Sequence, residues 1–202
     1  ASAEPVPGGG SASAVAAALG AGLVSMVASL SLGRPRYAEH EALLGTWVDR
    51  GRALSSRLLD LADEDAEAYA GFSAALKLPK ETDDERAARS EALHSAARTA
   101  AEVPLRCVEA CRDVVVGAEA LAGRSNVNAS SDLAVASLLV EAAARGAAAN
   151  VLVNLPATGD EALAADLSVR VDDLLREIER LALAAREVVR AGIARPAAVA
   201  GR

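Results

Sequence analysis

The sequence predicts an all-α protein, a bundle of long antiparallel helices, about five to seven in number, with no sheet. The composition is the first reason: 52% of the residues are hydrophobic but only 2% are aromatic, so Ala, Leu and Val must form the core. Alanine is the best helix former and a poor strand former. The second reason is periodicity, because apolar residues recur at helical spacing rather than in strand-like alternation. The 202 residues are expected to form one domain, 1–202.

The first predicted helix begins near Ser11, directly after Pro7-Gly8-Gly9-Gly10, and ends near Gly33. Three glycines in a row cost backbone entropy on folding, so we expect bare backbone to approach a ligand or another helix there. The uncharged run 12–32 is long enough to span a bilayer. Its many small and hydroxyl-bearing residues, and the lack of a basic segment before it, argue against a membrane span or signal peptide. The run therefore predicts the central helix of a soluble bundle or dimer.

The second predicted helix covers about 38–78, where apolar residues broadly follow a 3.6-residue period, and Pro79 ends it. Thr82 followed by Glu85 has the pattern of a capping box, so a third helix should begin near Asp83. We expect that helix to kink or break before Pro104, because proline lacks an N–H group and clashes with the preceding turn. It should resume and stop between residues 117 and 123.

Two further helices are predicted in the last third of the chain. One runs from about Asp132 to about Asn150, and the apolar stretch 151–155 is either its end or an extended segment. The last begins near Asp160 or somewhat later, and its apolar seam repeats at close to 3.5 residues with charges on either side. Such a seam is typical of a long antiparallel partner helix or of a subunit interface.

Composition also excludes several kinds of chemistry. The formal net charge of -7 argues against nucleic-acid binding, which needs a basic face. The two histidines, His40 and His94, stand apart from any second ligand at zinc-type spacing, so no metal site is expected. No nucleotide-binding lysine motif or nucleophile elbow is present. Cys107 and Cys111 are interpreted as small buried hydrophobic residues of a reducing compartment, and the expected location is cytoplasmic.

Three polar clusters remain as candidate sites. On the second predicted helix, Asp65 shares a face with two of the few aromatic side chains, Tyr69 and Phe72. Lys80 lies in the loop that follows. A third cluster, residues 126–132, joins two amides, a hydroxyl and a carboxylate at a helix start. Each has an ordinary alternative: a solvated acidic face, an exposed loop lysine, and turn or cap residues.

Taken in order along the chain, these motifs resemble the cyclodeaminase/cyclohydrolase family. That family includes the C-terminal domain of formiminotransferase-cyclodeaminase and stand-alone bacterial methenyltetrahydrofolate cyclohydrolases. The resemblance covers nearly the whole chain and weakens after about residue 156. Two departures are Arg34-Pro35-Arg36, where the family is usually lysine-rich, and Ser125, where a glycine is common. The matching segments are Pro7–Ser11, Gly33–Tyr37, Asp65–Tyr69, Leu78–Lys80, Asn126–Asp132 and Asn150–Leu155.

The resemblance implies an all-helical homodimer that acts on a one-carbon derivative of tetrahydrofolate without a metal or other cofactor. Two reactions fit it. One closes 5-formiminotetrahydrofolate to 5,10-methenyltetrahydrofolate and releases ammonia, and the other adds water to the methenyl carbon to give 10-formyltetrahydrofolate. A third alternative is a helical dimer that binds folate or serves as a scaffold without catalysis. Neither nucleic acid nor a membrane is an expected partner.

On this hypothesis Asp65 is an acid/base group, or the anion that faces the cationic C–N centre, and Lys80 is a second proton-transfer partner. Asn126, Asn128 and Asp132 are candidates for the pterin edge. Arg34 and Arg36 are candidates for the carboxylates of the glutamate tail. The remaining predicted substrate-binding residues are Gly8, Gly9, Gly10, Ser11, Tyr37 and Tyr69. We expect the three glycines to form the wall of a folate-sized cleft close to both Asp65 and Asn128.

Overall fold

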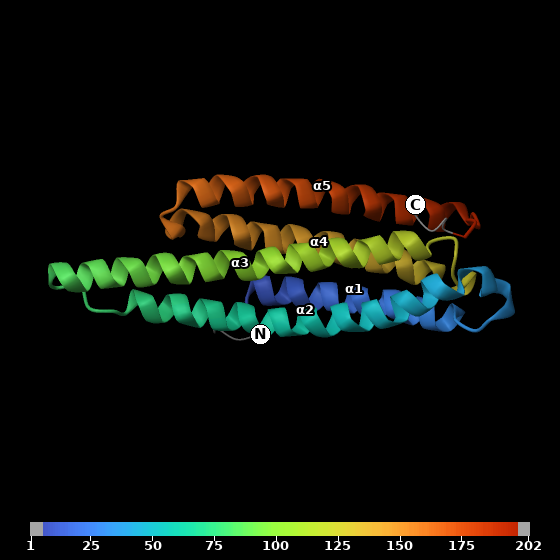
Figure 1. Ribbon diagram of the computed structural model, residues 1–202, viewed down its shortest axis with the longest axis horizontal. Helices are drawn as coiled ribbons and strands as arrows, with labels where there is room; N and C mark the ends of the chain where they lie inside the picture. The colour runs from blue at the N-terminus through green and yellow to red at the C-terminus, as the bar shows by residue number, and fades with distance from the viewer. Residues whose placement is uncertain (1–5, 198–202) are drawn as a thin grey trace.

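The computed structural model describes residues 6–197, which form a bundle of five long α-helices without a strand in that range. The helices lie side by side in antiparallel order, and α2 and α3 extend past the others at the end where α1 begins (Figure 1). The all-α prediction is confirmed. The α-helices are α1 (Gly9–Ser31), α2 (Glu41–Leu76), α3 (Asp83–Leu121), α4 (Ser130–Asn154) and α5 (Glu161–Ala191). Three short 3-10 turns join them: η1 (Pro35–His40), η2 (Val127–Ala129) and η3 (Leu155–Thr158).

Small residues let α1 lie close to its neighbours. A Cβ atom added to Gly51 of α2 would stand 2.8 Å from the Cβ of Ser25, and one added to Gly20 would stand 2.6 Å from a methyl group of Val140 on α4. The Ser25 hydroxyl also donates a hydrogen bond of 2.9 Å to the Val48 carbonyl on α2. These contacts explain why the core contains so few aromatic side chains: the helix axes are too close for them.

The two cysteines lie inside this core on α3. Cys107 and Cys111 are free thiols and both are buried, as the sequence predicted. A hydrogen bond with Cys107 and burial raise the pKa of the Cys111 thiol well above its usual value. A protonated, inaccessible thiol is a poor nucleophile, so this pair fills the core rather than taking part in chemistry.

Helix α3 passes through Pro104 without the predicted break. The helix is continuous from Asp83 to Leu121, and Pro104 is buried within it. A mid-helix proline leaves the carbonyl four residues earlier without its usual partner. That carbonyl belongs to Ala100, and the side-chain amide of Asn154 on α4 donates a hydrogen bond of 2.9 Å to it. Packing of α3 against α1, α2, α4 and α5 on its other faces holds the helix together.

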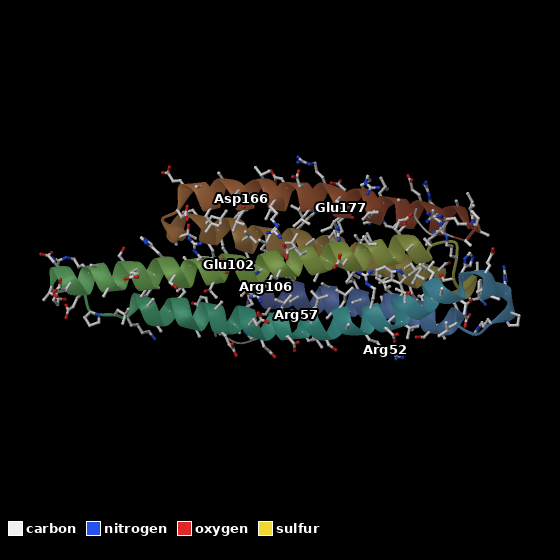
Figure 2. The ribbon with its side chains drawn as sticks, viewed as in Figure 1. Arg52, Arg57, Glu102, Arg106, Asp166 and Glu177 are labelled. Carbon is white, nitrogen blue, oxygen red and sulfur yellow. The ribbon has the colours of Figure 1, made fainter. Side chains whose placement is uncertain are left out.

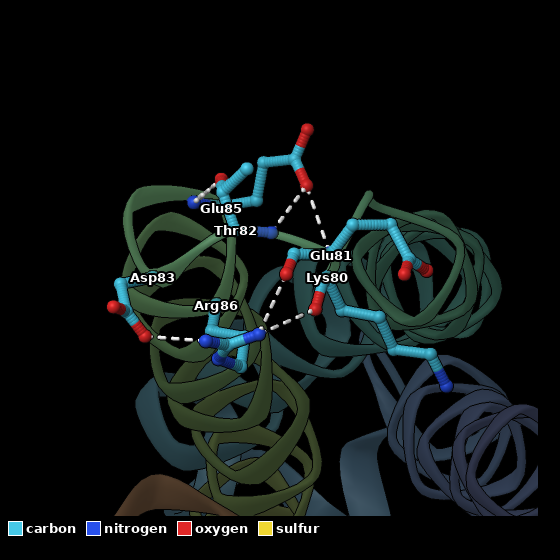
Figure 3. Close-up of polar contacts among 6 residues, drawn as sticks. All are labelled: Lys80, Glu81, Thr82, Asp83, Glu85 and Arg86. Atoms are coloured by element: carbon cyan, nitrogen blue, oxygen red, sulfur yellow. Dashed lines mark hydrogen bonds and ion pairs between the residues drawn. The ribbon is translucent and has the colours of Figure 1, made fainter.

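The tip between α2 and α3 is closed by the predicted capping box. The Glu85 backbone N–H donates to the Thr82 hydroxyl at 3.2 Å, and the Glu85 carboxylate accepts from the Thr82 backbone N–H at 3.0 Å. The Arg86 guanidinium donates to the carbonyl oxygens of Lys80 and Glu81 (Figure 3). The loop that carries Lys80 is therefore tied to α3 through its backbone.

Two helices keep an apolar stripe on the outside of the bundle. Helix α1 has no charged residue, and its flanks are covered by α2 and α4. Between those flanks Val15, Leu19, Met26 and Leu30 are each 39–61% exposed. The segments Gly9–Ser31 and Val127–Thr158 are long and apolar enough to cross a membrane, but about half of each, 56% and 44%, is buried in the bundle. On α4 the exposed apolar residues are Val135, Leu138, Leu152 and Val153.

Candidate functional site

A cleft of about 340 Å³ opens where α1 begins, beneath the part of α2 and α3 that extends past the other helices. Its floor is the bare backbone of residues 8–10. One wall comes from α2 and carries Asp65, Tyr69 and Phe72, the acidic and aromatic face predicted from helical spacing. The opposite wall comes from the end of α4 and carries Asn150 and Asn154. Because Ala100 of α3 also lines it, the cleft joins four segments that are far apart in the sequence.

The glycine run is explained by the approach of Asp65. A Cβ atom added to Gly10 would stand only 2.1 Å from Asp65 Oδ1, so no side chain fits there without moving the carboxylate. The Ser11 hydroxyl donates a hydrogen bond of 2.8 Å to Asp65 Oδ2. Asp65 thus lies over the N-terminus of α1, where the unpaired N–H groups and the helix dipole favour a negative charge. Oδ1 accepts no hydrogen bond from the described residues, and Asp65 lines the cleft.

We expect Gly10→Ala to remove most activity without unfolding the protein. The new methyl group displaces the end of a short, flexible side chain, and alanine is a better helix former than glycine by about 1 kcal/mol. The carboxylate, however, loses its place beside Ser11. The matched control is Gly45→Ala on α2, where an added Cβ meets nothing within 4 Å. Turnover and thermal unfolding of both variants measure the effect. Equal turnover in the two variants would contradict a role for this contact.

The neighbouring carboxylate, Glu64, forms ion pairs with arginines and does not line the cleft. It forms ion pairs with Arg57 of its own helix and with Arg106 of α3, the latter at 2.9 Å. The hydrogen bond from Arg57 and the charge of Arg106 hold the pKa of Glu64 below its usual value, against the opposing effect of burial. The two arginines lie close together between α2 and α3 (Figure 2). Glu64 therefore links two helices, and Asp65 is the carboxylate left for the cleft.

Six of the predicted substrate-binding residues lie at the opposite end of α1. At 1.5 Å per residue, the 23 residues of that helix separate the two ends by about 34 Å. The Asn126 backbone N–H donates to the Ser31 hydroxyl at 2.7 Å, and the Val127 N–H donates to the Tyr37 hydroxyl at 3.1 Å. Within one chain, therefore, the glycines are close to Asp65 but far from Asn128. The six residues at this second end are Arg34, Arg36, Tyr37, Asn126, Asn128 and Asp132.

The residues at this second end differ in their freedom to bind a ligand. Asn126 is buried, and its side chain accepts a hydrogen bond from the Asn128 backbone N–H, which is the turn-forming role left open above. Asn128 and both arginines are exposed, and the Arg36 guanidinium lies 5.7 Å from the centre of the Tyr37 ring. Arg36 and Tyr37 also line a separate cavity of about 150 Å³. Asn128, rather than Asn126, offers a free amide to a ligand.

Lys80 lies outside the cleft of its own chain. It is exposed on the α2–α3 tip, and about 16 Å of helix separates Asp65 from Leu76, where α2 ends. Its proposed role in proton transfer remains a prediction. No group of three or more His, Cys, Asp or Glu side chains among residues 6–197 is arranged to hold a metal ion.

Two polar residues of the cleft are not among the predicted site residues. Asn150 and Asn154 stand four residues apart on α4 and belong to a segment that contributes to the family resemblance. Their neighbours in the sequence are apolar, which conceals a polar role. The available signal was their spacing, since two amides at i and i+4 share one face of a helix. If the segment 150–155 is taken as the end of a helix antiparallel to the first one, Asn150 and Asn154 are expected at the end of the bundle that contains the glycine run.

Comparison with known proteins identifies the family. The family model described as formiminotransferase-cyclodeaminase matches residues 1–173. The chain is 41% identical over 177 residues to a methenyltetrahydrofolate cyclohydrolase of Methylorubrum extorquens, covering 88% of this chain and 85% of that protein. It is 37% identical over 171 residues to the rat formimidoyltransferase-cyclodeaminase, covering 85% of this chain but only 32% of that longer enzyme.

The fold is shared with a solved structure. The crystal structure of a formiminotetrahydrofolate cyclodeaminase from Thermotoga maritima superposes with a TM-score of 0.84 at 26% sequence identity. The match covers 94% of this chain and 91% of that one. The sequence matches extend along most of the chain, and the helices superpose over nearly all of it. The chain therefore belongs to the formiminotransferase-cyclodeaminase family.

Proposed function

We propose that this protein acts on the carbon that joins N5 and N10 in one-carbon derivatives of tetrahydrofolate, closing 5-formiminotetrahydrofolate to 5,10-methenyltetrahydrofolate. The observation that carries the proposal is the position of Asp65. Its carboxylate is held by Ser11 over the start of α1, inside a cleft with room for a ring system. The names of the relatives and of the Thermotoga maritima structure support this substrate class.

The ring closure requires the transfer of a proton from N10 to the leaving nitrogen. N10 attacks the formimino carbon and gives up its proton, the bond from that carbon to the terminal nitrogen breaks, and that nitrogen takes the proton and leaves as ammonia. The protonated formimino group and the methenyl product are both cations, so an anion beside the carbon stabilises the start and the end of the reaction, and the addition intermediate is neutral once N10 has lost its proton. Asp65 Oδ1 is the proposed acceptor of the N10 proton and the proposed anion beside the cation. Acid/base catalysis of this kind contributes roughly 10²–10⁴-fold.

The second candidate reaction is the cyclohydrolase reaction, and a specific observation favours it. The Methylorubrum extorquens cyclohydrolase is 41% identical to this chain, and the rat enzyme is 37% identical. Water would add to the methenyl carbon, the bond from that carbon to N5 would break, N5 would keep one proton, and one proton would be released. Asp65 would then take the proton from water. The same carboxylate and the same carbon serve both reactions, and neither reaction consumes a metal or a redox cofactor.

The proposed enzyme is a homodimer, because each chain holds only half of the predicted site. Helix α1 separates Gly10 and Asp65 from Asn128 by about 34 Å, more than one folate molecule can span in a compact site. Two copies of α1 packed antiparallel about a two-fold axis near Leu19 would place the Asn128 end of one chain beside the Asp65 end of the other. The uncharged α1, with its exposed apolar stripe, has the character of such a self-complementary interface.

Other features agree with a cytoplasmic enzyme of folate metabolism. The two buried thiols are compatible with a reducing compartment, and the net charge of -7 gives no support to nucleic-acid binding. In the dimer, Arg34 and Arg36 are the proposed ligands of the glutamate-tail carboxylates, with Asn128 and Asp132 against the pterin. Lys80, at the projecting tip, is proposed to act at a cleft built from both chains.

A spectroscopic assay tests these proposals together. The near-ultraviolet absorbance of 5,10-methenyltetrahydrofolate is followed in the presence of the protein and in buffer alone. Faster decay than in buffer identifies the cyclohydrolase. Growth of the same absorbance from 5-formiminotetrahydrofolate, with release of ammonia, identifies the cyclodeaminase. Binding of either compound without reaction would identify a non-catalytic folate-binding module and would contradict both enzymatic proposals.

A further inference from the structure

Two asparagine side chains in the cleft have their orientations fixed by the backbone. Asn154 Nδ2 donates to the Ala100 carbonyl on α3 at 2.9 Å and to the Asn150 carbonyl at 2.8 Å. Asn150 Nδ2 donates to the Gly146 carbonyl at 2.9 Å. Carbonyl oxygens only accept hydrogen bonds, so each amide must present its NH₂ group to the backbone. The amide oxygen on the same side chain therefore faces away from those carbonyls.

Pro104 leaves the Ala100 carbonyl free to accept a hydrogen bond from Asn154. In an uninterrupted helix the N–H group of residue 104 would donate to the carbonyl of residue 100. Proline has no N–H, so the Ala100 carbonyl is open to another donor, and Asn154 supplies it from α4. Both NH₂ hydrogens of Asn154 are then used. Its oxygen has no donor among residues 6–197, and both Asn154 and Ala100 line the cleft.

The cleft consequently contains three side-chain oxygens without a donor among residues 6–197, beside two side-chain donors, the Tyr69 hydroxyl and the second N–H of Asn150. Asp65 Oδ1 stands on the α2 wall, and the Oδ1 atoms of Asn150 and Asn154 belong to the α4 wall. The Ser11 hydroxyl, next to the floor in sequence, already donates to Asp65 Oδ2. No lysine or arginine lines this cleft. A ligand group that carries several N–H bonds and a positive charge would satisfy these oxygens, whereas a neutral carbonyl oxygen would meet them unfavourably.

We infer that Asn150 and Asn154 are substrate-binding residues that select an amidinium group over a neutral amide of the same shape. The inference rests on the proposed function, since it names the charge state that the folate one-carbon unit must have to bind. The formimino and methenyl groups are cationic amidines, and the 5-formyl group is a neutral amide of similar size. The two asparagine oxygens and Asp65 thus bind the cationic substrates more tightly than a neutral folate of nearly the same shape.

Kinetics with paired ligands tests the inference. For the wild-type protein we would measure KM for whichever cationic folate it converts, and Ki for 5-formyltetrahydrofolate as the neutral probe. Asn154→Leu keeps the size of the side chain and removes the acceptor. A hydrogen bond to a charged group corresponds to about 10–100-fold in binding, so KM should rise by about that factor. Ki for the neutral probe should stay the same or fall, because an opposing oxygen has been removed.

Further variants separate selectivity from folding. Asn154 bridges α3 and α4, so Asn150→Leu, which breaks no contact between helices, serves as a second test with the same expected pattern. Pro104→Ala restores a competing N–H for the Ala100 carbonyl and should shift the ratio in the direction of Asn154→Leu, by less.

The possible outcomes distinguish two kinds of failure. If the wild-type protein neither binds nor converts a cationic folate, the proposed function itself is wrong. If turnover is normal but the Leu variants weaken the cationic and the neutral ligand equally, the asparagines only shape the cleft and the inference is wrong. Opposite effects on the two ligands support it, because a general loss of structure would not improve the binding of either one.

Discussion

Asp65→Asn is expected to lower kcat by about 10²–10⁴-fold, the usual contribution of a positioned acid/base group. The amide is nearly the same size as the carboxylate, so the cleft keeps its shape and the Ser11 hydroxyl keeps an acceptor. What is lost is the negative charge and the ability to take a proton. KM should change less than kcat, because most of the binding surface is intact. Steady-state kinetics and thermal unfolding of the variant measure the two effects separately.

The matched control for this prediction is Asp63→Asn. Asp63 lies one half-turn away on α2, is exposed, and does not line the cleft. Its replacement removes one negative charge from the same region of the helix without touching Ser11 or Gly10. We expect turnover close to that of the wild-type protein. A comparable loss in both variants would mean that the charge of the helix, rather than the position of one carboxylate, controls the reaction.

Subunit complementation is the second large effect, and it tests the proposed intersubunit site directly. Asp65→Asn and Asn128→Ala homodimers should both be nearly inactive. When the two variants are co-expressed, a mixed dimer contains one site with both changes and one site with neither. Random pairing makes half of the dimers mixed, so about a quarter of wild-type activity should return. Activity measured on the co-expressed and the separately purified proteins gives the comparison.

Two further samples make that result decisive. A chain that carries both substitutions, co-expressed with the wild-type chain, leaves each mixed dimer with two singly damaged sites, so the mixed dimers should add no activity. Leu19→Arg places a charge at the centre of the exposed stripe of α1 and should give monomers by light scattering together with loss of activity. If co-expression of the single variants restores nothing while the proteins remain dimeric, the site is not shared in this way.

Much of the fold was predictable because its signals are local. The glycine at position 33 adopts the left-handed conformation, with φ of 71°, that lets a chain leave a helix, and the sequence placed the end of the first helix there. The side chains of Thr82 and Glu85 each accept a hydrogen bond from the other residue's backbone N–H, so this local pattern alone predicts the start of α3. Asp65, Tyr69 and Phe72 were correctly grouped because helical spacing decides which side chains share a face.

The features that were missed depend on contacts between distant segments. Pro104 has the local signal of a helix break, and only packing on several faces, with a donor supplied by Asn154, allows α3 to continue. The role of Asn150 depends on Gly9 and Gly10 lying across the cleft, which no spacing within α4 can reveal. The glycine run and Asn128 were expected in one cleft, but the length of α1 places them at opposite ends of the chain's bundle.

Pro104 also bears on how this protein would respond to engineering for heat resistance. A proline inside a helix costs roughly 3 kcal/mol, so a search for stabilising substitutions would select its replacement early. Such a search usually monitors melting temperature alone. Here the replacement would gain a backbone hydrogen bond in α3 and free the Asn154 amide to turn. The result would be a more durable enzyme with poorer discrimination between charged and neutral folates, a stability–function trade-off located in a residue that touches no substrate.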